Sequence, residues 1–159
     1  EHAGSLSLQI AEGLMEAQKE LQIPLVVVRH PNSDVSRPFC EALEKHEAVY
    51  VLPPTTYPEM LWLIEKARVV VTDSGGLQEE ATTLGTPVGI VRRVTDRAEA
   101  LESGAAKLLG IEAQGVCDGL ISMLNNSTSN RWMSQSTQVF GDGHATERAI
   151  KAILERFQS

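Results

Sequence analysis

Basic residues are scarce in this chain of 159 residues. Lysine and arginine together number 14 against 21 aspartates and glutamates, which leaves a formal net charge of −7. Proteins that bind the nucleic-acid backbone usually carry a basic stripe, so this balance argues against a nucleic-acid surface. It is compatible with one phosphorylated small molecule, because a helix N-terminus and a few arginines are enough to hold a phosphate.

Cysteine and long apolar runs are also in short supply. Cys40 and Cys117 stand far apart and outside any C-x-x-C spacing, which favours reduced thiols in a cytoplasmic protein over a disulfide. No apolar run approaches the roughly 20 residues of a transmembrane helix, so no membrane contact is expected, and no signal peptide is visible. With 42% hydrophobic and 22% charged residues, the chain is expected to be a soluble globular domain with a real core.

The histidines form no metal-ligating pattern. His2, His46 and His144 have no partners at ligand spacing, so we expect no metal site and no cofactor. His30 differs because it ends a predicted strand and precedes a proline. An imidazole there can donate to a phosphate or titrate near neutral pH. It is equally compatible with a loop histidine whose hydrogen bonds are all internal.

Strand-like and helix-like segments alternate along the chain. Short apolar runs predict strands, and apolar residues at helical spacing predict the helices between them. This alternation predicts an α/β fold, a Rossmann-like parallel sheet with helices on both faces. Residues 125–143 are polar and are expected to be part loop and part short helix. The predicted strands span residues 24–29, 49–52, 69–71, 88–91 and 106–109, and the predicted helices span 6–21, 35–46, 56–67, 77–84, 98–103, 112–124 and 145–157.

The first predicted helix has no strand before it. A strand normally leads into the first helix of an α/β unit, yet Leu6, Ile10 and Leu14 already show helical spacing at the start of the chain. We therefore expect a piece of a longer protein, with a strand that ends shortly before Glu1. In a sheet of order 3-2-1-4-5-6, that strand lies at the centre, beside the strand that leads into Ser74.

The stretch VVVTDSGGLQEEATTLGTPVGIV, residues 69–91, contains the clearest candidate site. A buried strand leads into Ser74, Gly75 and Gly76, where the glycines are expected to form a tight turn and to let a ligand approach the backbone. The following helix offers backbone N–H groups, a hydroxyl and the positive end of its dipole, which suit a phosphate or diphosphate. The alternative is that the glycines only make the turn and Ser74 only caps the helix.

Two adjacent glutamates follow in this helix. A carboxylate one turn into a helix at the ligand crevice can accept hydrogen bonds from ribose hydroxyls. Adjacent helical residues point about 100° apart, so only one of Glu79 and Glu80 can face the site. The other is expected to be solvated.

Three arginines gather after the next predicted strand. An arginine in a loop at the carboxyl end of a strand can clamp phosphate oxygens. The alternative is pairing with Asp96, Glu99 or Glu102, and the sequence leaves the two interpretations even. The arginines are Arg92, Arg93 and Arg97.

The stretch from Val71 to Gly104 resembles the C-terminal half of the non-hydrolysing UDP-N-acetylglucosamine 2-epimerases. That family shows a TDSGG-x-QEEA block, a G-x-P turn and then R-x-x-T-E-R-P-E, and this chain reads TDSGGLQEEA, GTP and RRVTDRAE. Further matches are the loop after His30, the helix around Trp62 and GDG at 141–143, so the resemblance covers nearly the whole chain. The chain departs from the family at Asp96, at Ala98 and in the His30 loop, which reads HPNSD.

The resemblance implies one half of a glycosyltransferase-B-like two-domain enzyme, with residues 1–159 as a single UDP-binding domain. The UDP-sugar would lie in the cleft between this half and an N-terminal half that supplies the catalytic residues, so no catalytic residue is expected here. The resemblance also implies that the complete protein is a cytoplasmic homodimer that serves polysaccharide precursor synthesis. By resemblance, the diphosphate is assigned to Ser74, Gly75 and Gly76, the ribose to Glu80, the nucleotide end to Arg97, the uracil to Thr55 and Met60, and a regulatory UDP-sugar site to His30.

The implied reaction is inversion at C2 of the sugar, from UDP-GlcNAc to UDP-ManNAc. UDP leaves by elimination and is then added back, so this half would hold UDP while it is detached. A chain truncated at Glu1 is expected to be inactive. The sequence leaves three alternatives open: half of a UDP-sugar glycosyltransferase, a non-catalytic UDP-sugar sensor, and a hydrolysing epimerase.

Overall fold

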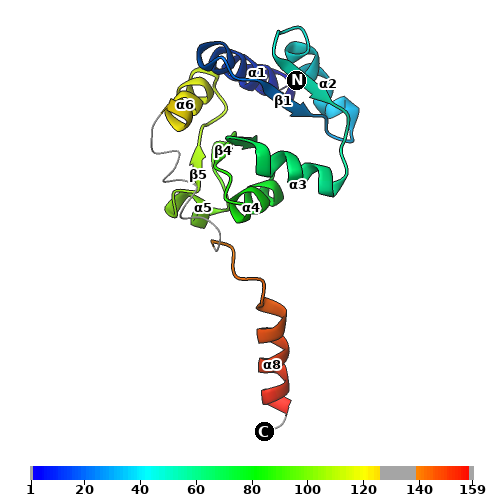
Figure 1. Ribbon diagram of the computed structural model, residues 1–159, viewed down its shortest axis with the longest axis vertical. Helices are drawn as coiled ribbons and strands as arrows, with labels where there is room; N and C mark the ends of the chain where they lie inside the picture. The colour runs from blue at the N-terminus through cyan, green and yellow to red at the C-terminus, as the bar shows by residue number, and fades with distance from the viewer. Residues whose placement is uncertain (1, 126–138, 158–159) are drawn as a thin grey trace.

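The computed structural model describes residues 2–125 and 139–157 of the chain, and it confirms the alternation of strands and helices (Figure 1). Most of the segment 125–143 lies outside the described residues. The predicted strand at 49–52 and the predicted helix at 145–157 have the predicted bounds, and the other elements differ from prediction at one or both ends. In chain order the elements are α1 (His2–Leu21), β1 (Leu25–Val28), α2 (Ser33–Leu43), β2 (Val49–Leu52), α3 (Tyr57–Lys66), β3 (Val70–Thr72), α4 (Gly75–Thr83), β4 (Val88–Ile90), α5 (Ala98–Glu102), β5 (Ala106–Leu108), α6 (Ala113–Asn125) and α8 (Ala145–Phe157).

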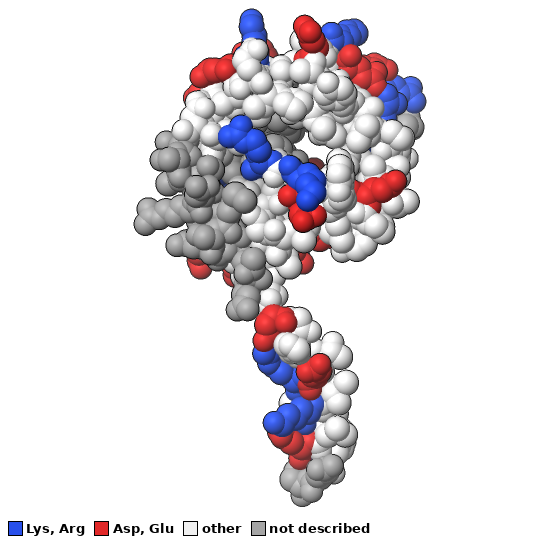
Figure 2. All heavy atoms as spheres, in the orientation of Figure 1, with Lys and Arg blue, Asp and Glu red and all other residues white. Residues whose placement is uncertain are grey.

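The strands form two parallel sheets rather than the single sheet expected from the sequence. One sheet has the order β1-β2 and the other the order β3-β4-β5. Both orders agree with 3-2-1-4-5-6 if the central position, between β1 and β3, is left unfilled. No described strand lies between β1 and β3, and in the space-filling view a hollow opens in the middle of the body (Figure 2). The division of the sheet therefore coincides with the place of the expected upstream strand.

Helices cover both faces of the three-stranded sheet. Alternate residues of a strand point to opposite faces, and all of β4 is buried. Val88 and Ile90 pack in one cluster with Ile64 of α3 and Ala81 of α4. The other face of the sheet packs against α1 and α6, in a cluster that includes Leu14, Val91, Leu109, Val116 and Leu120. This is the two-sided cover that a parallel sheet requires.

Small residues let elements approach one another closely on the α1 and α6 side. A Cβ at Gly13 of α1 would lie 2.3 Å from the carbonyl oxygen of Ala113, at the start of α6. A Cβ at Gly89 or at Gly119 would collide with the side chain of Leu109. Leu109 therefore fills the space between β4 and α6 that these two glycines leave.

The start of α3 carries the capping box that the T-x-x-E spacing predicts. The backbone N–H and the hydroxyl of Thr56 both donate to a carboxylate oxygen of Glu59, at 2.8 and 2.7 Å. These two hydrogen bonds, that of the backbone first, lower the pKa of Glu59. Thr55 directly precedes this capped start of α3.

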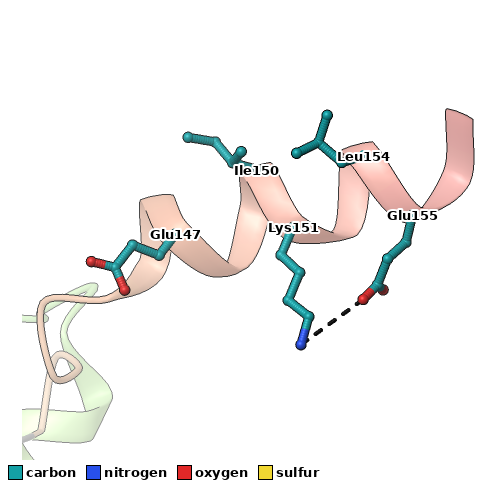
Figure 3. A pocket seen from close by; sticks show the side chains of 5 residues that line it. All are labelled: Glu147, Ile150, Lys151, Leu154 and Glu155. Carbon is teal, nitrogen blue, oxygen red and sulfur yellow. Dashed lines mark ion pairs between the residues drawn. The ribbon is translucent and has the colours of Figure 1, made fainter. Parts of the chain in front are cut away.

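Helix α8 extends away from the body (Figure 1) and none of its residues is buried. Ile150 and Leu154 lie side by side on one side of the helix, while Lys151 and Glu155 form an ion pair of 3.9 Å on another (Figure 3). The shallow hollow at this place is lined only by residues of α8 itself. Because no second element encloses it, this surface is not the candidate ligand site.

The two cysteines are free, as the sequence predicts, and both are buried. Cys40 packs with Val27 and Leu43, whereas Cys117 belongs to the cluster around α6. Burial raises the pKa of both thiols. Among the helices that the structure describes, none is long and apolar enough to cross a membrane.

Candidate functional site

The candidate site is the N-terminus of α4, directly after β3. Ser74 is the N-cap, and its hydroxyl accepts a hydrogen bond of 3.5 Å from the backbone N–H of Leu77. The backbone N–H of Ser74 donates to the hydroxyl of Thr72 at 3.0 Å, which fixes the chain at the strand end. The helix starts at Gly75, two residues earlier than predicted, and neither Gly75 nor Gly76 has a positive φ. The interpretation of these glycines as a tight turn is therefore wrong.

The two glycines instead keep the helix N-terminus free of side chains. A Cβ at Gly75 would lie 3.3 Å from Nη2 of Arg97, which is closer than an ordinary contact. Among the described residues, a Cβ at Gly76 would meet only the hydroxyl of Ser74, at 3.9 Å. Gly75 thus makes room for an arginine of the same protein, while the space beside Gly76 is open. Backbone N–H groups in the first turn of a helix have no intrahelical partner, so an anion can reach them here.

The side chain of Arg97 lies beside the N-terminus of α4. The sequence left its role undecided between a phosphate clamp and ion pairing. Its Nε donates to Oε1 of Glu79 at 2.5 Å, and its Nη1 donates to Oδ2 of Asp96 at 2.6 Å. The hydrogen bond with Glu79 is the largest cause that raises the pKa of Arg97. The ion-pairing interpretation is confirmed for Asp96, and Glu79 is a further partner. Nη2 of Arg97 also lies over Gly75, so the phosphate clamp stays a prediction. Arg92 also pairs with Asp96, at 3.5 Å.

Glu79 and Glu80 differ in their surroundings. The glutamate not assigned to the ribose, Glu79, was expected to be solvated. Its side chain is 41% exposed, but it also forms an ion pair with Arg97 that the sequence did not predict. The carboxylate of Glu80 makes no hydrogen bond or ion pair with the residues that the structure describes, and its side chain is half-buried. Glu80 is therefore the glutamate whose acceptor oxygens are still available to a ligand.

Sequence reasoning missed a second connection between α4 and the arginine loop. The hydroxyl of Thr95 donates to Oε1 of Gln78 at 3.0 Å and accepts from the backbone N–H of Arg97 at 3.1 Å. Gln78 is completely buried, so this hydrogen bond attaches the loop of Thr95 and Arg97 to the buried side of α4. The only signal in the sequence was the adjacency of Gln78 and Glu79, and it does not reveal which residues they bind.

The predicted uracil residues lie near the start of α3 in different surroundings. The hydroxyl of Thr55 is buried without a hydrogen-bond partner among the described residues, beside a surface hollow. Met60 is partly buried and packs against the cluster of Ile64 and Ala81. Trp62 is 58% exposed and is the aromatic side chain of the hollow, which is lined by Leu52, Thr55, Pro58, Glu59, Trp62 and Leu63.

His30 lies apart from these residues, directly after β1 in the two-stranded sheet. Its Nδ1 accepts a hydrogen bond of 3.0 Å from the backbone N–H of Asn32. A neutral imidazole held in this way carries its proton on Nε2, which is then available to donate. Within the described part of the chain, no group of three or more His, Cys, Asp or Glu side chains is placed to hold a metal ion.

Comparison with known proteins identifies the same family as the sequence motifs. The family model described as UDP-N-acetylglucosamine 2-epimerase matches residues 2–154. The chain is 34% identical to the UDP-N-acetylglucosamine 2-epimerase of Yersinia pestis over 91% of its own length and 39% of the relative's. The chain thus spans about two fifths of the length of the curated relatives that it matches.

Solved structures match closely as well. The complex of S. aureus MnaA with UDP is 28% identical, with a TM-score of 0.86 over 98% of this chain and 42% of that one. The UDP-GlcNAc 2-epimerase of Methanocaldococcus jannaschii in complex with UDP-GlcNAc and UDP is 28% identical, with a TM-score of 0.80 over 95% of this chain and 41% of that one. These similarities extend over almost the whole chain and agree with the TDSGG-x-QEEA block at α4. The chain belongs to the UDP-N-acetylglucosamine 2-epimerase family.

Proposed function

We propose that this chain is the UDP-binding half of an enzyme that converts UDP-GlcNAc to UDP-ManNAc by elimination and re-addition of UDP. The observation that supports it best is the open N-terminus of α4, with Nη2 of Arg97 over Gly75 and free space at Gly76. A diphosphate there receives backbone N–H groups, the helix dipole and a guanidinium, which stabilise the charge that develops on the departing UDP. Glu80 accepts from the ribose hydroxyls, Thr55 and Met60 lie toward the uracil, and His30 belongs to a regulatory site.

The proposal includes an N-terminal half that faces this site and carries out the proton transfer at C2. Two observations support it: the curated relatives are much longer than this chain, and the sheet is divided between β1 and β3. We place a strand from that half in the central position of the sheet. The enzyme is proposed to be a cytoplasmic homodimer that serves polysaccharide precursor synthesis.

The proposed reaction is tested by incubating the complete protein with UDP-GlcNAc and no acceptor. Formation of UDP-ManNAc supports the proposal. Free ManNAc with UDP indicates a hydrolysing epimerase, and turnover only after an acceptor is added indicates a glycosyltransferase. Binding of UDP-GlcNAc without turnover in any of these assays indicates a sensor.

Glu80→Gln in the complete protein is expected to weaken UDP binding by about 1.5–3 kcal/mol, because a charged acceptor for the ribose hydroxyls is lost. Titration calorimetry with UDP measures the effect. Affinity for inorganic diphosphate, which has no ribose, is expected to stay at the wild-type level. Unchanged affinity of Glu80→Gln for UDP would show that the ribose lies elsewhere.

Gly76→Ala is expected to raise stability and to lower UDP affinity at the same time. Alanine fits at this position in the free protein and is favoured over glycine in a helix by about 0.5–1 kcal/mol. The added methyl group then occupies the space that the diphosphate needs, which is expected to weaken UDP binding about tenfold or more. Thermal unfolding and calorimetry measure the two effects. A stabilised variant that binds UDP like the wild type would contradict a diphosphate at this place.

A further inference from the structure

We propose that Glu79 is a positioning residue that holds the Arg97 guanidinium over the N-terminus of α4, ready for the diphosphate. Glu79 itself does not touch the nucleotide. The inference rests on the proposed function, because it assumes that UDP binds at Ser74, Gly75 and Gly76. It goes further by giving the two adjacent glutamates of α4 separate tasks.

The geometry of α4 places Glu79 where it can direct Arg97. Gly75 and Glu79 are four residues apart and thus lie on the same face of the helix. Arg97 lies along this face, with Nε on Oε1 of Glu79 at 2.5 Å and Nη2 3.3 Å from the position of a Cβ at Gly75. The planar guanidinium is therefore held by Glu79 through Nε, and its Nη2 is the atom nearest to the first residue of α4.

The hydrogen-bond capacity of Arg97 is only partly used. A guanidinium has five N–H donors; Nε donates to Glu79 and Nη1 to Asp96. Nη2, the nitrogen that lies over Gly75, donates to none of the residues that the structure describes. The two N–H groups of Nη2 are thus free, among the described residues, to donate to a diphosphate beside the first turn of α4.

The contact with Glu79 adds order to a side chain that is otherwise held, among the described residues, only by Asp96, its neighbour in the chain. The loop backbone is already held, because the buried Gln78 accepts from the hydroxyl of Thr95, which accepts from the N–H of Arg97. The long side chain of Arg97 still has several rotatable bonds, and ordering it when the ligand arrives reduces affinity. Glu79 provides that order before the nucleotide binds, which is preorganisation of the anion site.

The charge of Glu79 distinguishes this role from a direct contact. A carboxylate close to a diphosphate repels it, and in the wild type the guanidinium of Arg97 compensates for this repulsion. Glu79 is therefore expected to help UDP binding only while Arg97 is present. If Arg97 is replaced by glutamine, the same carboxylate becomes unfavourable for the diphosphate. A residue that bound the ribose directly would help in both backgrounds.

The test is a double-mutant cycle in the complete protein, with UDP affinity measured by calorimetry and uridine affinity by NMR titration. The variants are Glu79→Gln, Arg97→Gln and the double variant. Glu102→Gln is the charge-matched control, because Glu102 is an exposed glutamate of α5. Glu79→Gln is expected to weaken UDP binding about 3- to 10-fold, the cost of ordering one long side chain, and to leave uridine binding unchanged. In the Arg97→Gln background it is expected to have no effect or to strengthen UDP binding.

A second readout does not depend on any ligand. The Nε–H of Arg97 is expected to give a sharp, slowly exchanging NMR signal in the wild type and in Glu102→Gln, and to lose it in Glu79→Gln. Wild-type UDP affinity of Glu79→Gln, or equal weakening of UDP and uridine, would overturn the positioning role while the proposed function stands. Failure of the wild type to bind UDP would overturn the proposed function and this role with it.

Discussion

The 159-residue chain by itself is expected to bind UDP weakly and to show no epimerisation of UDP-GlcNAc. The complete protein is expected to bind UDP more tightly and to form UDP-ManNAc. The contacts proposed for the diphosphate and the ribose, at Ser74 and Glu80, belong to this chain. In the proposed reaction, the proton at C2 of the sugar is removed and returned by groups of the proposed N-terminal half. Calorimetry with UDP and an assay of UDP-ManNAc formation measure the two properties.

The control for this comparison is the fold of the shortened chain. A circular dichroism spectrum with the helix content of the folded domain is needed before the absence of turnover is interpreted. A mixture of the shortened chain with a separately expressed N-terminal half is expected to recover activity. Measurable turnover by the 159-residue chain alone would contradict the division of labour between the two halves.

In the complete protein, the backbone N–H of Val71 is expected to exchange with solvent about 5- to 150-fold more slowly than in a chain truncated at Glu1. Alternate residues of a strand direct their N–H and C=O groups to opposite edges. Val70 donates to Pro87 and Thr72 accepts from Val91, both toward β4, so the polar groups of Val71 face the opening between β3 and β1. A strand in that place gives them partners, and an unpaired buried backbone group costs about 1–3 kcal/mol, which corresponds to this range of rates.

Val70 provides the internal control for the exchange experiment. Its N–H is bonded to Pro87 in the adjacent loop at 2.9 Å, so it is expected to be protected in both proteins. On the other side of the opening, Val26 and Val28 of β1 are expected to behave like Val71. Equal exchange of Val71 in the two proteins, with a cooperative unfolding transition in the truncated chain, would show that no strand belongs between β1 and β3.

The sequence by itself determined the type and place of the elements. Apolar runs such as Val49–Leu52 and amphipathic stretches such as Ala145–Phe157 follow periodicities that depend on neighbouring residues only, and both were found with the predicted bounds. The block around Ser74 identified the family and the candidate anion site because it, too, is a local feature of the sequence. Its residues are contiguous, so their spacing alone places them at a strand end and a helix start.

The tertiary structure decided which side chains meet and where the sheet divides. Glu79 and Arg97 are 18 residues apart. They meet because β4 pairs with β3 and the loop after β4, which carries Arg97, returns to α4. The requirement for glycine at position 75 likewise depends on Arg97, which occupies the space where a side chain would lie. Strand pairing is also non-local, so the unfilled position between β1 and β3 became visible only when the strands were arranged in space.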